Sequence, residues 1–263
     1  MRVDEHTINL DESPVFYRST DAPGVPVLYL HGIPTSSDDW VEFLARTGGI
    51  APDLIGFGRS GKGGHLDYSL AGLTGFVERF LAEVRADAVK LVAHDWGVAV
   101  GLMLAGRHPE RIERLVLLNA PPVFEEFAWP RVVKWWRSPL IGEGLMGSTS
   151  RGMLARTLRH GCVRPEAWTD QRIASVWDQF DQGTQRAILR LVRSRVVEPK
   201  PSSTRTPTLI IWGDRDPWYP PALADAYAAR LPGSTLERLS DAGHWPWLDR
   251  PGLVERVATF LEE

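Results

Sequence analysis

Residues 92–97, Val-Ala-His-Asp-Trp-Gly, place an aspartate between a strand pattern and a helix pattern. A sharp turn at such a junction holds one side chain above the end of a sheet, and in the pattern G-x-S-x-G that side chain is a nucleophile. Here Asp95 takes the nucleophile position, Ala93 replaces the first glycine and Gly97 keeps the second. An aspartate at this place can also simply cap the following helix. Its chemistry therefore depends on the residues that the fold brings to it.

Three more segments with polar or reactive residues each follow a predicted strand. They are residues 31–34 (His-Gly-Ile-Pro), residues 212–217 with two aspartates, and residues 242–247 with His244. The carboxyl ends of parallel strands meet at one edge of a sheet, where ligands bind. The chain order nucleophile, acid, histidine therefore predicts a catalytic triad at that edge.

A carboxylate nucleophile indicates a particular reaction. It is already ionised at neutral pH and can displace a leaving group from a saturated carbon. The product would be an alkyl ester of Asp95, which water must hydrolyse. We expect His244 to take the proton from that water and the backbone N–H groups of Ile33 and Trp96 to form the oxyanion hole.

Strand and helix patterns alternate along most of the chain, which predicts an α/β fold with a mostly parallel sheet flanked by helices. Residues 7–18 predict a hairpin that precedes this alternation. Ser69 is predicted to cap a helix that continues to residue 84. Strands are predicted at 25–30, near 50, and at 89–93, 112–118, 208–212 and 235–239, and helices at 39–45, 97–107, 221–231 and 253–261.

The alternation stops at residue 122, and residues 122–205 contain helical patterns without a convincing strand. Ile188, Leu191 and Val192, for example, lie opposite a row of arginines at helical spacing. Residues 199–207 predict a linker. We therefore expect a core of residues 1–121 and 206–263, interrupted by a helical insertion at 122–205.

The composition excludes several classes of function. The chain has 263 residues, 43% of them hydrophobic, and a formal net charge of −3, which argues against nucleic acid as its main partner. The single cysteine, Cys162, excludes a disulfide framework and a cysteine-cluster metal site. No apolar run is long enough for a membrane span, and no signal peptide is visible. We expect a cytoplasmic protein with a small-molecule substrate, no membrane partner, and neither cofactor nor metal.

Residues 56–61 match the dinucleotide pattern G-x-G-x-x-G literally, but that function needs a helix to begin there. Lys62-Gly63-Gly64-His65 follow instead and do not favour a helix. Residues 56–62 also approach a phosphate-binding loop, although Gly63 stands where a hydroxyl should hold magnesium. We interpret the stretch as a glycine-rich turn.

Together these motifs resemble the α/β-hydrolase family over almost the whole chain. His94-Asp95-Trp96-Gly97 is similar to the branch with an aspartate nucleophile, which comprises epoxide hydrolases and haloalkane dehalogenases. The resemblance identifies residues 122–205 with the family's cap domain. It implies that Asp216, three residues after Gly213, is the acid of the triad rather than Asp214. It also implies that His31 and His94 are framework residues.

The sequence departs from the family in the residues that would stabilise the leaving group. Epoxide hydrolases usually protonate the opening ring with two cap tyrosines, but the tyrosines here are at positions 17, 29, 68, 219 and 227. Val192 occupies the position of one of the missing phenols, in a segment that resembles the tyrosine-bearing cap helix. An epoxide hydrolase of this sequence would need another donor, for which His160 or a bound water is the candidate.

Haloalkane dehalogenases instead bind the departing halide with N–H donors. Trp96 matches one of them, and the second is often an asparagine where this chain has Ile33, or else a cap tryptophan. The candidates are Trp129, Trp135, Trp136, Trp168 and Trp177.

Residues 117–122 and 183–193 look more like epoxide hydrolases, so the sequence predicts epoxide hydrolysis first and haloalkane dehalogenation second. A ligand-binding protein without turnover is the third hypothesis. Trp96, Pro34, His160 and Val192 are the expected contacts to the apolar substrate.

Overall fold

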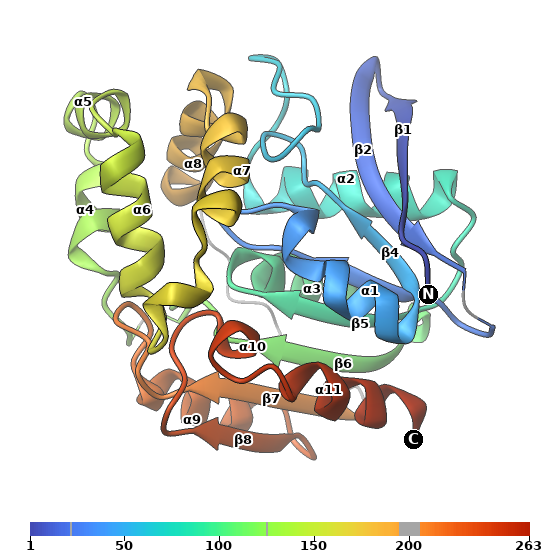
Figure 1. Cartoon of the computed structure of the whole chain (residues 1–263). Coiled ribbons are helices and arrows are strands. Elements are labelled where there is room, and N and C mark those ends of the chain that lie inside the picture. The colour runs from blue at the N-terminus through green and yellow to red at the C-terminus, as the bar shows by residue number, and fades with distance from the viewer. Residues whose placement is uncertain (22, 125, 195–205) are drawn as a thin grey trace.

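The computed structural model describes residues 1–263 except 22, 125 and 195–205. Its centre is an eight-stranded sheet in the order β1-β2-β4-β3-β5-β6-β7-β8 (Figure 1). β1 and β2 form an antiparallel hairpin, β2 pairs antiparallel with β4, and every later neighbour is parallel. The predicted α/β fold is therefore confirmed. The strands are β1 (Asp4–Leu10), β2 (Ser13–Thr20), β3 (Val27–Leu30), β4 (Gly49–Pro52), β5 (Val89–His94), β6 (Ile112–Leu118), β7 (Thr208–Gly213) and β8 (Thr235–Leu239).

Helices cover both faces of the sheet. α2 and α3 pack on each other, and α1 packs on α11 in front of the sheet in Figure 1. Ser69 caps α2 as predicted, because its side chain accepts the Gly72 N–H. The helix predicted at 39–45 is divided into a 3-10 turn, Ser37–Trp40, and α1. The core helices are α1 (Val41–Thr47), α2 (Leu70–Glu83), α3 (Trp96–Arg107), α9 (Pro221–Arg230), α10 (Pro246–Asp249) and α11 (Leu253–Glu262).

Between β6 and β7 the described residues contain helices and no strand. We call residues 122–194 the cap segment. Figure 1 shows its helices gathered beyond the carboxyl ends of the parallel strands. Most of the linker predicted at 199–207 lies outside the described residues, so the domain boundary at 205 stays a prediction. The cap helices are α4 (Arg131–Arg137), α5 (Ile141–Gly147), α6 (Arg151–His160), α7 (Asp170–Gln179) and α8 (Gln182–Arg193).

The central strand β5 ends directly before Asp95. Leu91, Val92 and Ala93 are 0% exposed, as expected for a parallel strand that helices cover on both faces. Such a strand offers little freedom to the residues that follow it. None of the described helices combines the length and apolar character needed to cross a bilayer.

Candidate active site

Asp95 lies at the sharp turn between β5 and α3, with φ 50° and ψ −126°. This backbone conformation is uncommon for a residue with a side chain. The turn is possible because two glycines surround it: a Cβ on Gly32 would lie 2.5 Å from the Cβ of Asp95, and one on Gly97 would lie 2.3 Å from a main-chain oxygen. The Asp95 side chain makes no capping hydrogen bond to α3. The geometry is thus that of a nucleophile elbow rather than a helix cap.

The two oxygens of the Asp95 carboxylate have different partners. Oδ2 accepts the backbone N–H of Ile33 at 2.9 Å. Oδ1 accepts the hydroxyl of Tyr219 at 2.5 Å. Burial raises the pKa of Asp95 above its ordinary value, although His244, the Tyr219 hydroxyl and the N–H groups of Ile33 and Trp96 oppose the rise. The N–H groups of Ile33 and Trp96 are thus directed at this carboxylate, where the oxyanion hole was predicted.

His244 and Asp216 come together although 27 residues separate them. Nδ1 of His244 lies 2.7 Å from Oδ2 of Asp216, which also accepts the Asn119 amide at 2.8 Å. The other oxygen of Asp216 accepts the N–H groups of Trp218 and Tyr219. Both oxygens of Asp216 thus have hydrogen-bond partners. The carboxylate holds the imidazole in one tautomer, with the proton on Nδ1 and Nε2 free to act as a base. Asp214 pairs with Arg238 instead.

Aromatic rings enclose the imidazole of His244. The rings of His94, Trp218 and Trp245 lie edge-on to it, with centroids 4.6, 4.8 and 4.7 Å away. Burial alone would lower the pKa of His244, but the charges of Asp216, Asp95 and Asp39 outweigh it and raise that pKa above its ordinary value. Near pH 7 a larger fraction of His244 is therefore protonated than of an isolated imidazole.

The two framework histidines contact main-chain groups, in line with the role that the resemblance implies. Nε2 of His31 accepts the Leu54 N–H at 2.9 Å, and its Nδ1 contacts the Gly32 carbonyl oxygen at 2.7 Å. Nε2 of His94 contacts the carbonyl oxygen of His244 at 2.8 Å. Burial lowers the pKa of both rings. Both are thus neutral imidazoles that fix the loops around the site.

Tyr219 contacts Asp95, and the sequence did not predict this contact. The resemblance places phenol donors in the cap, residues 122–205, whereas Tyr219 lies in the core loop after β7. The sequence does contain one indication, because Tyr219 follows Asp216 by only three residues. Asp216 also accepts hydrogen bonds from the N–H groups of this loop. The side chain of Tyr219 is buried, and its hydroxyl donates to Oδ1 of Asp95.

Comparison with known proteins agrees with this geometry. A model of the alpha/beta hydrolase fold family matches residues 25–251. The chain belongs to the α/β-hydrolase fold family. A haloalkane dehalogenase from Mesorhizobium japonicum is 28% identical, over 96% of this chain and 89% of its own length. Epoxide hydrolase 1 from Caenorhabditis elegans is 26% identical, over 99% of this chain and 70% of its own length.

Solved structures show the same fold. The crystal structure of haloalkane dehalogenase DbeA from Bradyrhizobium elkani has a TM-score of 0.83 and 23% identity, and the match covers 99% of this chain and 98% of the other. This α/β hydrolase thus has relatives named for both of the reactions that the sequence predicted.

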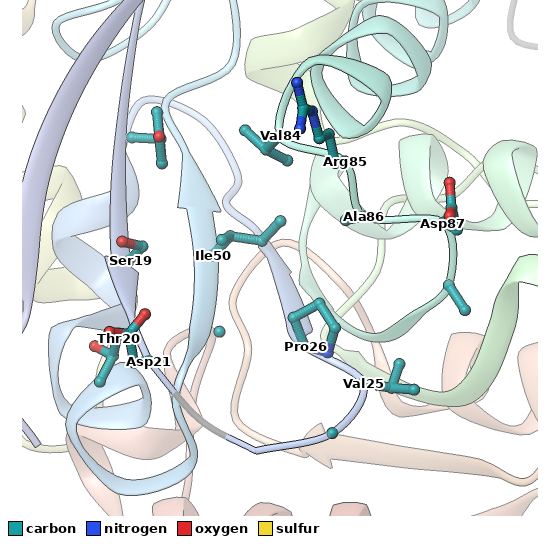
Figure 2. A pocket seen from close by; sticks show the side chains of 14 residues that line it. Ser19, Thr20, Asp21, Val25, Pro26, Ile50, Val84, Arg85, Ala86 and Asp87 are labelled. Carbon is teal, nitrogen blue, oxygen red and sulfur yellow. The ribbon is translucent and has the colours of Figure 1, made fainter.

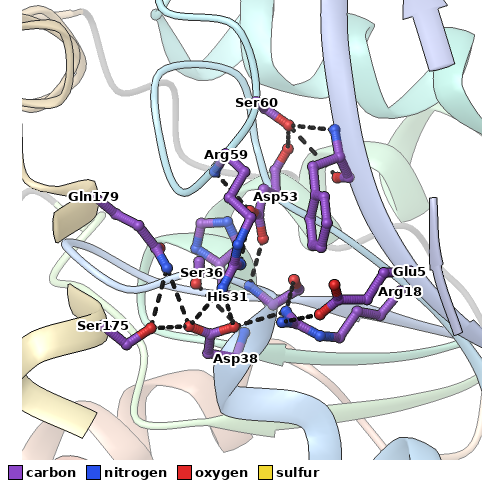
Figure 3. Close-up of polar contacts among 12 residues, drawn as sticks. Glu5, Arg18, His31, Ser36, Asp38, Asp53, Arg59, Ser60, Ser175 and Gln179 are labelled. Carbon is purple, nitrogen blue, oxygen red and sulfur yellow. Dashed lines mark hydrogen bonds and ion pairs between the residues drawn. The ribbon is translucent and has the colours of Figure 1, made fainter. Parts of the chain in front are cut away.

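In this α/β hydrolase the glycine-rich turn after β4 encloses the chain's own carboxylate (Figure 3). Asp53 accepts the N–H groups of Ser37 at 2.7 Å and Arg59 at 2.8 Å. A Cβ on Gly58, which has a φ of +55°, would lie 2.1 Å from an oxygen of Asp53. The motif that resembles a phosphate loop therefore binds an anion, but that anion is Asp53.

Asp38 links the cap segment of the hydrolase to its core (Figure 3). It accepts hydrogen bonds from Ser175 at 2.6 Å and Gln179 at 3.1 Å, both on α7. From the core, Arg18 and Arg59 pair with it at 2.7 and 3.0 Å. Burial alone would raise the pKa of Asp38, but these hydrogen bonds and cations lower it below its ordinary value. The link thus stays ionic at neutral pH.

The predicted cap contacts of the hydrolase differ in their relation to Asp95. Trp129 stacks on Trp96, with ring centroids 5.5 Å apart and an interplanar angle of 11°. His160 is exposed, and its ring contacts Trp218 rather than Asp95. Val192 is fully buried in α8, so a tyrosine substituted there would overpack its surroundings.

Of the remaining predicted cap tryptophans, Trp135 is 54% exposed. Trp168 is buried against Trp245, and Trp177 stacks on Phe180. Trp136 is partly buried against the core. Trp129 is therefore the cap indole with a direct contact to Trp96.

A cavity of about 510 Å³ lies at the opposite edge of the sheet (Figure 2). Val25 and Pro26, which line it, precede β3, and Asp87 precedes β5. Asp95, in contrast, follows β5. The cavity is therefore remote from the catalytic edge. No cluster of metal-ligating side chains occurs among the described residues.

The Asp216–His244 pair leads to a pH-dependent prediction. Asp216→Asn should lower the pKa of His244, because it removes the main charge that raises it, and in serine enzymes the equivalent change costs about 10⁴-fold in rate. With His244 as the predicted base, the step that it serves accelerates with pH as the imidazole loses its proton. In Asp216→Asn that step should become slow, and its acid limb should move to lower pH. Decay of an alkyl-enzyme followed across pH measures both effects. An acid limb that stays at the wild-type position would contradict this role of Asp216.

Proposed function

We propose that this α/β hydrolase forms a covalent alkyl ester on Asp95 and releases it with water activated by His244, with epoxides as the first substrate class. The observation that carries the proposal is the arrangement around one buried carboxylate: a backbone N–H on Oδ2, and a histidine–aspartate pair beside it. A carboxylate in this setting can attack a substrate through Oδ1 and carry the oxyanion charge on Oδ2.

In the first step Oδ1 of Asp95 attacks a saturated carbon, and the bond from that carbon to the leaving atom breaks. The electron pair goes to the leaving oxygen or halide. In the second step water attacks Cγ, and His244 removes its proton. Oδ2 then carries the negative charge, which the N–H groups of Ile33 and Trp96 stabilise. Loss of one such donor typically costs about 10²–10³ in rate.

The residues expected near the leaving group favour an epoxide over a halide. The side chain at position 33 is isoleucine, which offers a departing halide no N–H donor besides the backbone. An epoxide oxygen can instead take its proton from a water. General acid help is typically worth about 10²–10⁴ in rate, and the sequence of the cap segment contains no tyrosine. We therefore expect slow epoxide turnover that favours aryl-substituted epoxides, whose carbon tolerates partial positive charge.

Haloalkane dehalogenation is the second candidate, and the stack of Trp96 on Trp129 favours it. Two neighbouring indoles can supply two N–H donors to a halide. The relatives named haloalkane dehalogenase point in the same direction. In this case Trp129, rather than the exposed Trp135, would be the second donor.

A direct assay distinguishes these functions. The protein is incubated with styrene oxide and, separately, with a bromoalkane, and the diol and free bromide are measured. Diol formation without bromide release is the expected result. Bromide release with untouched epoxide would overturn the epoxide proposal in favour of the second candidate. Turnover of neither, with measurable binding of both, would leave a binding protein without this chemistry.

A further inference from the structure

The two oxygens of Asp95 cannot play the same part in the proposed reaction. Oδ2 accepts the Ile33 N–H and therefore takes the oxyanion position. Oδ1 makes its described hydrogen bond with the Tyr219 hydroxyl. Oδ1 is thus the oxygen that attacks the substrate, and it becomes the bridging oxygen of the ester. The phenol lies beside the atom that must later leave with the product.

We infer that Tyr219 is a catalytic residue of the second step, in which it donates its proton to Oδ1 as the bond between Cγ and Oδ1 breaks. This inference rests on the proposed function, but it does not depend on whether the substrate is an epoxide or a haloalkane. Both would give an alkyl ester with the same bridging oxygen.

The atoms and protons of this step balance. Water adds to Cγ and gives one proton to His244, which leaves the negative charge on Oδ2. The carbonyl reforms at Oδ2, the bond from Cγ to Oδ1 breaks, and its electron pair stays on Oδ1 with the alkyl group. Oδ1 takes the proton of Tyr219, and the His244 imidazolium returns a proton to the phenolate. Asp95 is left as a carboxylic acid that carries the water oxygen, and it ionises before the next cycle.

The loop after β7 holds the phenol in place for this transfer. Asp216 accepts the Tyr219 N–H with one oxygen and contacts His244 with the other. The rings of Tyr219 and His244 meet edge-on, with centroids 5.2 Å apart. Acid, base and phenol therefore form one unit, and the phenol needs no movement to reach Oδ1.

The pKa of Tyr219 changes during the cycle in the direction that proton donation needs. In the free enzyme, burial and then the charge of Asp95 raise the pKa of Tyr219 well above its ordinary value, so the phenol keeps its proton. Alkylation removes the charge of Asp95. The pKa of Tyr219 must then fall towards its ordinary value, which makes the phenol a better acid in the intermediate that needs one.

The experiment compares Tyr219→Phe with Tyr227→Phe as a matched control. Tyr227 is a second buried phenol, but its hydroxyl donates to the carbonyl oxygen of Pro121. Each variant is mixed with styrene oxide and with a bromoalkane, and intact-mass spectrometry follows the alkyl-enzyme over time. Thermal unfolding checks that both variants are folded.

With every substrate that alkylates the wild type, Tyr219→Phe should gain the alkyl mass at a rate close to wild type and lose it about 10²–10⁴-fold more slowly. Tyr227→Phe should follow the wild type in both phases. An adduct that disappears at the wild-type rate would overturn the inference. So would a variant that has lost alkylation by the epoxide but kept alkylation by the bromoalkane, because Tyr219 would then serve ring opening.

An isotope measurement separates this inference from the proposed function. In a single turnover in ¹⁸O-water, the wild type should release product whose new oxygen comes from Asp95, and the label should remain in the protein. Wild-type protein that never gains an alkyl mass from either substrate would refute the proposed function, and the inference with it. A normal wild-type cycle with a fast Tyr219→Phe variant refutes the inference alone.

Discussion

His244→Gln should arrest the protein as its alkyl-enzyme. The ester of Asp95 forms without a base, whereas its hydrolysis needs one, so only the second step loses its catalyst. The variant should gain one alkyl mass per chain and release no further product, with steady-state turnover lowered by at least about 10⁴-fold. Intact-mass spectrometry after addition of styrene oxide or a bromoalkane measures the adduct, and peptide mapping should place it on Asp95.

Glutamine is the suitable replacement because it fills most of the imidazole volume and can still meet Asp216. An inactive variant that never gains mass would show that His244 also serves the first step. A variant that turns over at the wild-type rate would remove His244 from the mechanism. Because the adduct should form with either substrate class, this test does not depend on the leaving group.

Asp95→Ala should abolish turnover and adduct formation on every substrate that the wild type accepts. The loss of the nucleophile itself is worth at least about 10⁴-fold in related covalent enzymes. The variant should nevertheless remain folded with a melting temperature near that of the wild type, because relief of the buried charge is opposed by the N–H and phenol donors that lose their acceptor. The raised pKa of Asp95 means that its ionised form is destabilised by burial in the native state, and alanine removes that cost at neutral pH.

The stability measurement also tests the simpler interpretation of Asp95. If the side chain were a helix cap, its removal should cost about 0.5–2 kcal/mol in the free energy of unfolding. Thermal and urea unfolding of the two proteins at pH 7 distinguish the cases. Retention of wild-type activity in Asp95→Ala would disprove the assignment of the nucleophile.

The fold, and the meeting of Asp95, Asp216 and His244 at one edge of the sheet, could be predicted because each leaves a local mark, while their catalytic roles stay predictions. Asp95 directly follows β5, Asp216 lies three residues after the end of β7 and His244 five residues after the end of β8. A parallel sheet carries the loops that follow its strands to one edge. Buried strands such as β5 and the serine cap of α2 are likewise encoded within a few neighbouring residues.

Tyr219 and the cap residues could not be placed in the same way. The contact between Tyr219 and Asp95 spans 124 residues, and the sequence does not say where a loop side chain points. The pattern of α8 shows that Val192 lies on its apolar face, but not whether that face meets the substrate or other side chains. His160 has the right chemistry for a donor, and only the packing of α6 reveals that its ring meets Trp218.

The enclosed Asp53 has a consequence for how such sequences are compared. The glycine-rich turn is already occupied by an internal anion, so a side chain on Gly58 would collide with the Asp53 carboxylate that the turn holds. Replacement of Asp53 by a neutral residue would leave the N–H groups of Ser37 and Arg59 without that acceptor, at a cost of about 1–3 kcal/mol for the buried Ser37 donor. The glycine spacing of residues 56–61 therefore follows from the packing around Asp53 and needs no nucleotide to explain it.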